Sequence, residues 1–223
     1  MHRLSLRETS EVVDRICKLE VTHITVYNWC MRFISVLVML LSLLRIEYEK
    51  IWHVDEKYIK IKGSKDDFAY LFVVADSNSK IIAVYVSNRR DTDNAKLILQ
   101  KARALAGKPE IIITDGCEIY NKACRIFGRK VKHLKTHFEA KLTAYHGKIL
   151  KLCNNRIERL NSDVDLFLHI FRGLKSFRTA QIWLEGFRIY HNYLKPSSVR
   201  WYKICLLYTS DAADELDGVD LGG

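Results

Sequence analysis

The chain has little of what marks several common classes of protein. Its 223 residues include two prolines, ten glycines and six cysteines, and no two cysteines form a Cys-x-x-Cys pair. Unpaired, scattered cysteines are typical of a reduced intracellular protein and do not indicate a disulfide framework. No glycine-rich phosphate loop is present, so ATP-driven chemistry has no support. Internal repeats and low-complexity segments are also absent from the sequence.

Long apolar runs are lacking as well. The most apolar stretch, residues 34–44, has eleven residues, whereas a helix needs about twenty to cross a bilayer. We expect this stretch to form a buried connecting helix. The N-terminus carries Glu8, Glu11 and Asp14 where a secretory signal would need an apolar core. The sequence therefore predicts a cytoplasmic protein without membrane contact.

The last residues differ in origin from the rest. From about Cys205 to Gly223 the sequence back-translates into a sequencing-library adapter, so we interpret this tail as translated adapter and expect the natural C-terminus to be missing. The tail carries five acidic residues and no Lys or Arg, so without it the formal charge rises from +10 to +15. Such a basic excess indicates a polyanionic partner such as nucleic acid, although lysine-rich surfaces also aid solubility.

Three acidic residues lie in distinct contexts. Asp55 lies in residues 51–63, where apolar and polar side chains alternate as in a half-buried strand. Asp115 follows residues 111–113, a continuous β-branched run typical of a strand buried on both faces. Glu158 lies near the start of a segment whose apolar residues recur at helical spacing.

Carboxylates that a fold gathers in one place repel one another, and a divalent cation is the usual reason to collect them. We therefore expect Asp55, Asp115 and Glu158 to bind Mg²⁺, or Mn²⁺ in its place. Two such ions could activate a water or 3′-hydroxyl and stabilise the leaving oxygen of a phosphodiester. Each acid alone would be interpreted as an ordinary surface residue, and the combination of three favours a site.

These motifs resemble those of the DDE-type transposases of small bacterial and archaeal insertion sequences, over most of residues 51–196. The similar segments are the strand around Asp55, residues 114–116 followed by Tyr120, residues 154–161, residues 172–176 and residues 190–193. The resemblance implies a ribonuclease H-like catalytic domain in which the three acids are the metal-binding catalytic triad.

The helix after Glu158 departs from the family pattern. Family members usually carry a basic residue two turns further on, which is expected to hold the DNA ends, whereas this chain has Asp165 there. Phe167 and His169 also stand where charge is expected. The resemblance therefore supports the acid triad more strongly than DNA-end binding by this helix, and a decayed, inactive copy is the alternative.

The segment that joins the second and third acids is basic. Residues 122–159 contain eleven Lys or Arg and two acids, which indicates a surface that follows a phosphate backbone beside the metals. In the catalytic region we expect DNA contacts from Lys130, Lys132, Asn155, Arg156, Arg159, Asn161, Arg172 and Lys175. His133 and His137 have a spacing that suits zinc, but no cysteine pair completes a set, so zinc is not favoured.

Two helices are predicted at the N-terminus. Ser5 and Glu8 have the spacing of a capping box that begins a helix ending near Cys17, and Thr22 begins a second helix. A short link between two helices is typical of a helix-turn-helix, whose second helix would present side chains to a DNA groove. These side chains are His23, Thr25, Asn28 and Arg32. Short helical pairs are also abundant in other proteins, so both interpretations stay open.

The remaining pattern predicts an α/β fold. Strands at residues 69–75 and 80–87, joined by a turn-forming cluster, would follow the Asp55 strand as an antiparallel meander. A helix from Thr92, the Asp115 strand, a helix at residues 118–127 and a strand at residues 130–134 complete the order. We expect a ribonuclease H-like mixed five-stranded sheet flanked by helices, with the first and fourth strands adjacent.

The expected organisation has three parts. Residues 1–45 form the helix-turn-helix segment and connecting helix, residues 51–204 the C-terminally truncated catalytic domain, and residues 205–223 the adapter tail. The expected function is a DNA transposase, a polynucleotidyl transferase that cleaves element ends and transfers strands into target DNA. Its partners would be double-stranded DNA and at least a second copy of itself, on the nucleoid. The alternatives are a non-catalytic DNA-binding descendant and a structure-specific nuclease.

Overall fold

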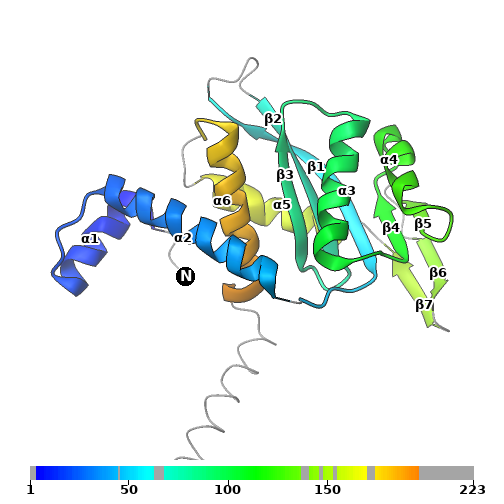
Figure 1. The fold of residues 1–223 in the computed structure, drawn as a ribbon, viewed down its shortest axis with the longest axis horizontal. Coiled ribbons are helices and arrows are strands. Elements are labelled where there is room, and N and C mark those ends of the chain that lie inside the picture. The colour runs from blue at the N-terminus through cyan, green and yellow to red at the C-terminus, as the bar shows by residue number, and fades with distance from the viewer. Residues whose placement is uncertain are drawn as a thin grey trace, which may run out of the picture.

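A mixed five-stranded sheet lies at the centre of the computed structural model, which describes residues 4–44, 46–62, 68–136, 141–145, 148–152, 155–169 and 174–195. The strands lie in the order β3-β2-β1-β4-β5 (Figure 1). They are β1 (Ile51–Lys60), β2 (Phe68–Asp76), β3 (Ile81–Ser87), β4 (Ile111–Thr114) and β5 (Lys132–Lys135). The first three are antiparallel, and β4 and β5 run parallel to β1. This is the expected ribonuclease H-like sheet, and its first and fourth strands are neighbours.

Alternation along β1 divides the interior into two cores. Trp52 and Val54 point to the face covered by α3 (Thr92–Ala106), α4 (Glu118–Ala123) and the short helix η1 (Cys124–Phe127). Ile59, two residues beyond Lys57, points to the face covered by α5 (Asn155–Leu168) and α6 (Phe177–Ile189). Odd-numbered and even-numbered residues of β1 therefore face different helices.

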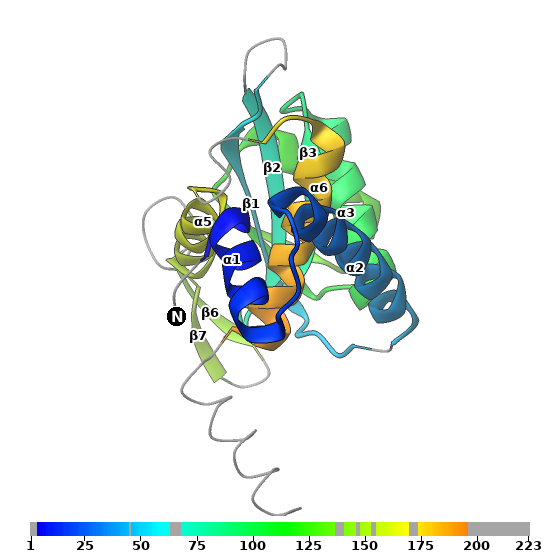
Figure 2. The same cartoon turned by 90° about the vertical axis from the view of Figure 1, so that its left-hand side faces the viewer.

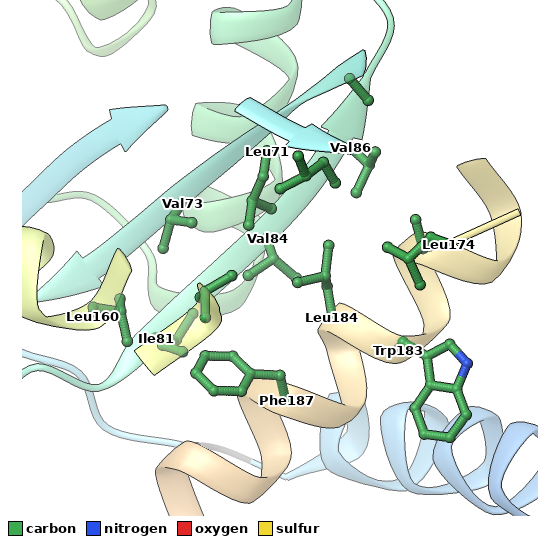
Figure 3. Close-up of a cluster of buried hydrophobic side chains, with 14 of the residues drawn as sticks. Leu71, Val73, Ile81, Val84, Val86, Leu160, Leu174, Trp183, Leu184 and Phe187 are labelled. Atoms are coloured by element: carbon green, nitrogen blue, oxygen red, sulfur yellow. The ribbon is translucent and has the colours of Figure 1, made fainter. Parts of the chain in front are cut away.

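The second core lies between the sheet and the helices α5 and α6. Figure 3 shows Leu184 and Phe187 of α6 directed toward Val84 and Ile81 of β3, with Leu160 of α5 in the same cluster. All five side chains are buried. This packing holds α5 and α6 against the sheet, because burial of large aliphatic and aromatic side chains is the main favourable term in such contacts.

The two N-terminal helices begin where the sequence predicts. α1 (Leu6–Cys17) has a complete capping box, in which the Glu8 amide donates to Ser5 Oγ and the Ser5 amide donates to the Glu8 carboxylate. α2 (His23–Leu43) begins after Thr22, whose hydroxyl accepts from the Thr25 amide at 3.2 Å. α1 and α2 lie on the side of α6 that faces away from the sheet (Figures 1 and 2).

The prediction for residues 34–44 is right about the helix and wrong about its burial. Residues 34–43 belong to α2, which runs without interruption for 21 residues, and its one buried residue is Val26. By length and by its mean hydropathy of 1.7, α2 passes the test for a membrane span, although core helices and N-terminal signal sequences pass it too. α2 packs on α6 close to Gly186, where an added Cβ would lie 2.6 Å from Ile34 Cδ1. Further along, a cavity of about 510 Å³ lies between α2, α3 and α6.

Other differences are smaller. β5 begins two residues later than predicted, and the predicted helix at residues 118–127 is α4 followed by η1. A separate two-stranded hairpin, β6 (Lys141–Tyr145) and β7 (Lys148–Leu152), was not predicted. Its strands are rich in lysine and lie in the basic segment, where charge masks the alternation that marks a strand.

After α6 the chain makes a π-helical turn, η3 (Tyr190–Leu194), that ties the helix to the sheet. Asn192 is buried there, and its side chain bonds both backbone groups of Ile81 at the start of β3. The Ile81 amide donates to Asn192 Oδ1 at 2.9 Å, and Asn192 Nδ2 donates to the Ile81 carbonyl at 2.8 Å. Without the Asn192 side chain, the amide and the carbonyl of Ile81 would lose these hydrogen-bond partners in a buried place.

We predict that Asn192→Ala lowers the free energy of unfolding by about 2–4 kcal/mol, because two buried backbone groups lose their partner. Urea denaturation monitored by circular dichroism measures the change. Leu194→Ala, in the same turn but with an exposed side chain, is the control and should change stability by less than about 1 kcal/mol. Equal effects of the two substitutions would contradict the role of the Asn192 bonds.

Candidate metal centre

Two of the three predicted acids end up next to each other because of strand register. β1 and β4 are parallel, and their last paired residues are His53 and Ile113. Asp55 lies in β1 two residues beyond this last pair, and Asp115 is the first residue after β4, so both acids lie at the same end of two adjacent strands. The Asp115 charge contributes to the shifted pKa of Asp55. The parallel pair therefore confirms the expectation that Asp55 lies close to Asp115.

Asp115 is fixed by a tight turn at the end of β4. Its Oδ1 accepts a hydrogen bond from the Cys117 amide at 2.9 Å, and Gly116 has a φ of 98°, which favours glycine. The preceding Thr114 hydroxyl is 2.9 Å from His133 Nε2. His133 is half-buried beside the end of β4, while His137 lies outside the described residues.

Burial and negative neighbours disfavour the charged form of Asp55. Together they raise the pKa of its carboxyl to about 7, with burial as the largest cause, followed by the Glu56 charge and, more weakly, the Asp115 charge. Two hydrogen bonds oppose the shift, from the Glu56 amide at 2.9 Å and from Asn161 Nδ2 at 2.9 Å. A group that loses its proton near neutrality is suited to exchange that proton for a cation.

Asn161 connects α5 to this acid pair. Its side chain bonds Asp55, while its backbone carbonyl accepts from Lys57 Nζ at 2.9 Å. Lys57 also forms an ion pair with Asp165 at 2.5 Å. The acid that departs from the family pattern is therefore paired with a β1 lysine, and α5 is anchored to β1 through both contacts. Asn161 thus holds Asp55, a role that the sequence did not predict, and the DNA contact predicted for Asn161 stays a prediction.

Glu158 is not part of the pair. It is exposed on α5, three positions before Asn161 and on the same side of the helix. Within the described part of the chain, no three His, Cys, Asp or Glu side chains are arranged to hold a metal ion. The structure thus brings Asp55 and Asp115 together and leaves Glu158 outside, and the three-carboxylate site stays a prediction.

A second buried acid, Glu56, lies behind Asp55 on the other face of the sheet, and its role was not predicted from the sequence. Because side chains alternate along β1, Glu56 points to the opposite face of the sheet. There it accepts from the Tyr120 hydroxyl and forms an ion pair with Arg90, with only 4% of its side chain exposed. Burial and the Glu56 charge together raise the pKa of Tyr120 well above its usual value. The alternation places Glu56 behind Asp55, but no sequence pattern predicts Arg90 as its partner.

The other residues that the sequence predicts to contact DNA lie on several separate elements. Lys132 pairs with Ile111 at the start of β4, so Lys132 and the nearby Lys130 lie at the opposite end of these strands from Asp115. Arg159 and Lys175 are exposed, as are His23, Asn28 and Arg32 on α2, while Thr25 is half-buried. Arg172 lies outside the described residues, and so do the side chains of Asn155 and Arg156. DNA binding by these residues stays a prediction.

The donor set around Asp55 suits a hard divalent cation. Two carboxylates repel each other at the ends of adjacent strands, and Asn161 Oδ1 is buried with no hydrogen-bond partner in the residues that the structure describes. Carboxylate and amide oxygens are the ligands that Mg²⁺ and Mn²⁺ prefer. A cation would relieve the repulsion, and the orphaned oxygen would gain a partner in the cation or its water.

Comparison with known proteins identifies the family. Residues 49–197 match the family model described as a DDE domain. The transposase of the insertion sequence-like element IS431mec from Staphylococcus aureus is 30% identical over 114 residues, which are 51% of this chain and 49% of that transposase. The transposase of insertion sequence element IS257 in transposon Tn4003, also from Staphylococcus aureus, has the same identity and coverage. The chain spans about half the length of the relatives that it matches.

Solved structures with a similar arrangement include the HTLV-2 integrase catalytic core domain in complex with magnesium, in its trimeric form. It is 17% identical with a TM-score of 0.49, covering 70% of this chain and 93% of that chain. The intasome of simian T-cell lymphotropic virus in complex with PP2A regulatory subunit B56 gamma has the same identity and score, covering 70% and 52%. With more than half of its length inside the matched domain, the chain belongs to the DDE domain family of transposases.

Proposed function

We propose that this chain catalyses the cleavage of DNA at the ends of a mobile element and the transfer of the resulting 3′-hydroxyls to target DNA. The observation that carries the proposal is the placement of Asp55 in β1 and of Asp115 just beyond the adjacent parallel strand β4, with the Asp115 charge acting on Asp55 and α5 anchored to Asp55 through Asn161. Membership of the transposase family supports DNA as the substrate.

In this proposal Asp55, Asp115 and Glu158 hold the catalytic cations. The chemistry supplied by two bound Mg²⁺ or Mn²⁺ ions is activation of the attacking oxygen and stabilisation of the leaving oxygen. Asn161 orients the Asp55 carboxylate, and the turn at Gly116 orients Asp115. Glu158 would approach the pair by a change of side-chain conformation, because it already lies on the same side of α5 as Asn161. Both reactions are in-line transesterifications, so one cluster can serve both.

The partners follow from the same proposal. Double-stranded DNA, as terminal repeats and as target, would contact the basic side chains, and joining two ends would require at least two copies of the chain. Exposed Arg159 lies next to Glu158 on α5, so it would meet the phosphates nearest to the cations.

Two observations favour a second candidate, a DNA-binding protein without catalysis. Glu158 stands outside the acid pair, and Asp165, where a basic residue was expected, is paired with Lys57. A chain of this kind would bind DNA but cleave none at any concentration of Mg²⁺ or Mn²⁺. The two candidates differ in turnover, which a cleavage assay measures directly.

Asp55 gives a test of metal binding that does not need activity. Its folded-state pKa of about 7 exceeds the ordinary value of 3.8, so between these values the folded protein holds a proton that the unfolded chain releases. Stability from this group is therefore full below about pH 4 and is lost as the pH rises through 7. We predict that Asp55→Asn gains stability relative to wild type as the pH rises from 5 to 8, by on the order of 2–3 kcal/mol.

The same variant should lose its response to metal. In thermal denaturation at pH 8, millimolar Mg²⁺ should raise the melting temperature of the wild type and leave that of Asp55→Asn unchanged, because a ligand is missing. At pH 6 the gain of the wild type should be smaller, since a proton competes with the cation. Asp93→Asn, at an exposed site on α3, is the matched control. Equal stabilisation of Asp55→Asn and wild type by Mg²⁺ would rule out a cation at Asp55.

For catalysis we predict that Asp115→Asn reduces both cleavage and strand transfer by roughly 1,000-fold or more, about 4 kcal/mol of barrier. Asparagine can still accept the Cys117 amide bond, so the turn and DNA binding should persist. The substrate is a duplex made from the inverted repeats that flank the reading frame, followed by gel electrophoresis. Activity retained in Asp115→Asn, against an unchanged Asp93→Asn control, would contradict the assignment.

A further inference from the structure

Helix α2 has two apolar faces, of which only one is used within the chain. On the inner face Tyr27 contacts Trp183 of α6, with ring centroids 6.1 Å apart, and Ile34 packs over Gly186. Cys30 and Met31 join the same core. This face is enough to dock α2 on α6, as Figures 1 and 2 show.

The opposite face carries a stripe of large apolar side chains that is open to solvent. The stripe, called the α2 stripe from here on, consists of Trp29, Phe33, Val36, Leu40 and Leu43, which are 45%, 64%, 48%, 48% and 76% exposed. Soluble monomers rarely leave a continuous apolar stripe of this length in water. Such a patch indicates a surface that is covered in the functional protein.

The spacing of the stripe indicates what covers it. Successive members are four, three, four and three positions apart, which is the 3.5-residue period of a helix that packs along a second helix. In that register Met31 and Val38 lie diametrically opposite the stripe, and both are half-buried on the inner face. α2 therefore packs on its own domain through one face and presents the α2 stripe, with the spacing that suits a partner helix, on the opposite face.

The composition of the helix favours a second copy of the chain over a bilayer. A helix surrounded by lipid is apolar on all sides, whereas Asn28, Arg32 and Ser35 are exposed beside the stripe. Across His23–Leu43 the only Lys, Arg, Asp or Glu is Arg32. Two strongly basic copies could therefore approach along α2 with little of the repulsion that the rest of their surfaces would produce.

The area is also sufficient for a pair. Five side chains of this size, about half exposed, would bury roughly 500 Å² on each copy and about 1,000 Å² in total, which is the lower bound for a specific interface. An identical patch on both copies is what a two-fold symmetric dimer requires.

We propose that two copies of this chain dimerise by packing α2 against α2 through the α2 stripe. The pairing deepens the proposed function, since it names the surface by which two copies meet, but it does not involve Asp55, Asp115 or Glu158. Because α2 is docked on α6, the dimer would join the two sheets through a rigid helical connection.

Sedimentation velocity on the full chain at micromolar concentrations, without DNA, tests the dimer. The wild type should sediment as a species of twice 26.0 kDa, and the double variant Phe33→Glu with Leu40→Glu as a monomer, with a dissociation constant at least tenfold higher. Leu97→Glu, at a similarly exposed leucine on α3, should remain dimeric. A monomeric wild type, or a dimer that survives the double variant, would overturn the proposal.

Cysteine crosslinking tests the surface in a chain whose fold is undisturbed. Val36→Cys, at the centre of the stripe, should form a disulfide-linked dimer under mild oxidation, while its neighbour Ser35→Cys, exposed beside the stripe, should not exceed the wild-type background. Equal crosslinking at both positions would overturn the proposal. So would flotation of the wild type with phosphatidylcholine–phosphatidylglycerol vesicles that is lost in the Phe33→Glu and Leu40→Glu variant, because lipid would then be the occupant.

These outcomes separate the two proposals. A dimer with no magnesium response at Asp55 would contradict the catalytic assignment and leave the α2 interface standing. A monomer that still gains stability from Mg²⁺ would contradict the α2 interface and leave the metal site at Asp55 standing.

Discussion

Parallel pairing of β1 with β4 is the contact on which the rest of the site depends, because it holds two carboxylates together against their mutual repulsion. Burial and the Glu56 charge are the main causes of the raised pKa of Asp55, and the Asp115 charge adds to them. The strand pair is stabilised by apolar packing on both faces of the sheet, where Trp52 and Val54 lie in one core and Ile59 in the other. In the proposed function, a bound cation would offset the free energy that burial of these carboxyls costs.

Most of the fold could be predicted from two sequence patterns, which are the alternation of apolar and polar residues and short continuous apolar runs. The alternation around Asp55 and the β-branched run before Asp115 defined β1 and β4 closely, because a strand's burial is visible in its own sequence. The proximity of the two acids followed from the expected strand order. The role of Asn161 could not be predicted in the same way, since whether its amide meets DNA or Asp55 depends on how α5 packs across β1.

The failures have a common physical origin. Residues 34–44 are apolar, and we interpreted that as burial within the chain, yet hydrophobicity alone does not distinguish a core, a bilayer and a second protein surface. The structure adds which face of α2 contacts α6. Likewise the sequence identified Glu158 as an acid but not its distance from the other two, because the rotation of α5 is set by packing of Ile157 and Leu160 in the core.

Alternation along β1 also limits how the gene can vary. Asp55 and Glu56 face opposite sides of the sheet, so the insertion or deletion of one residue between Ile51 and Asp55 would turn the Asp55 side chain toward α4 and away from Asn161 of α5. A two-residue change would keep the side but move Asp55 about 7 Å along the strand, out of step with Asp115. Insertions and deletions among related chains should therefore lie in turns such as the one between β2 and β3, and rarely within this half of β1.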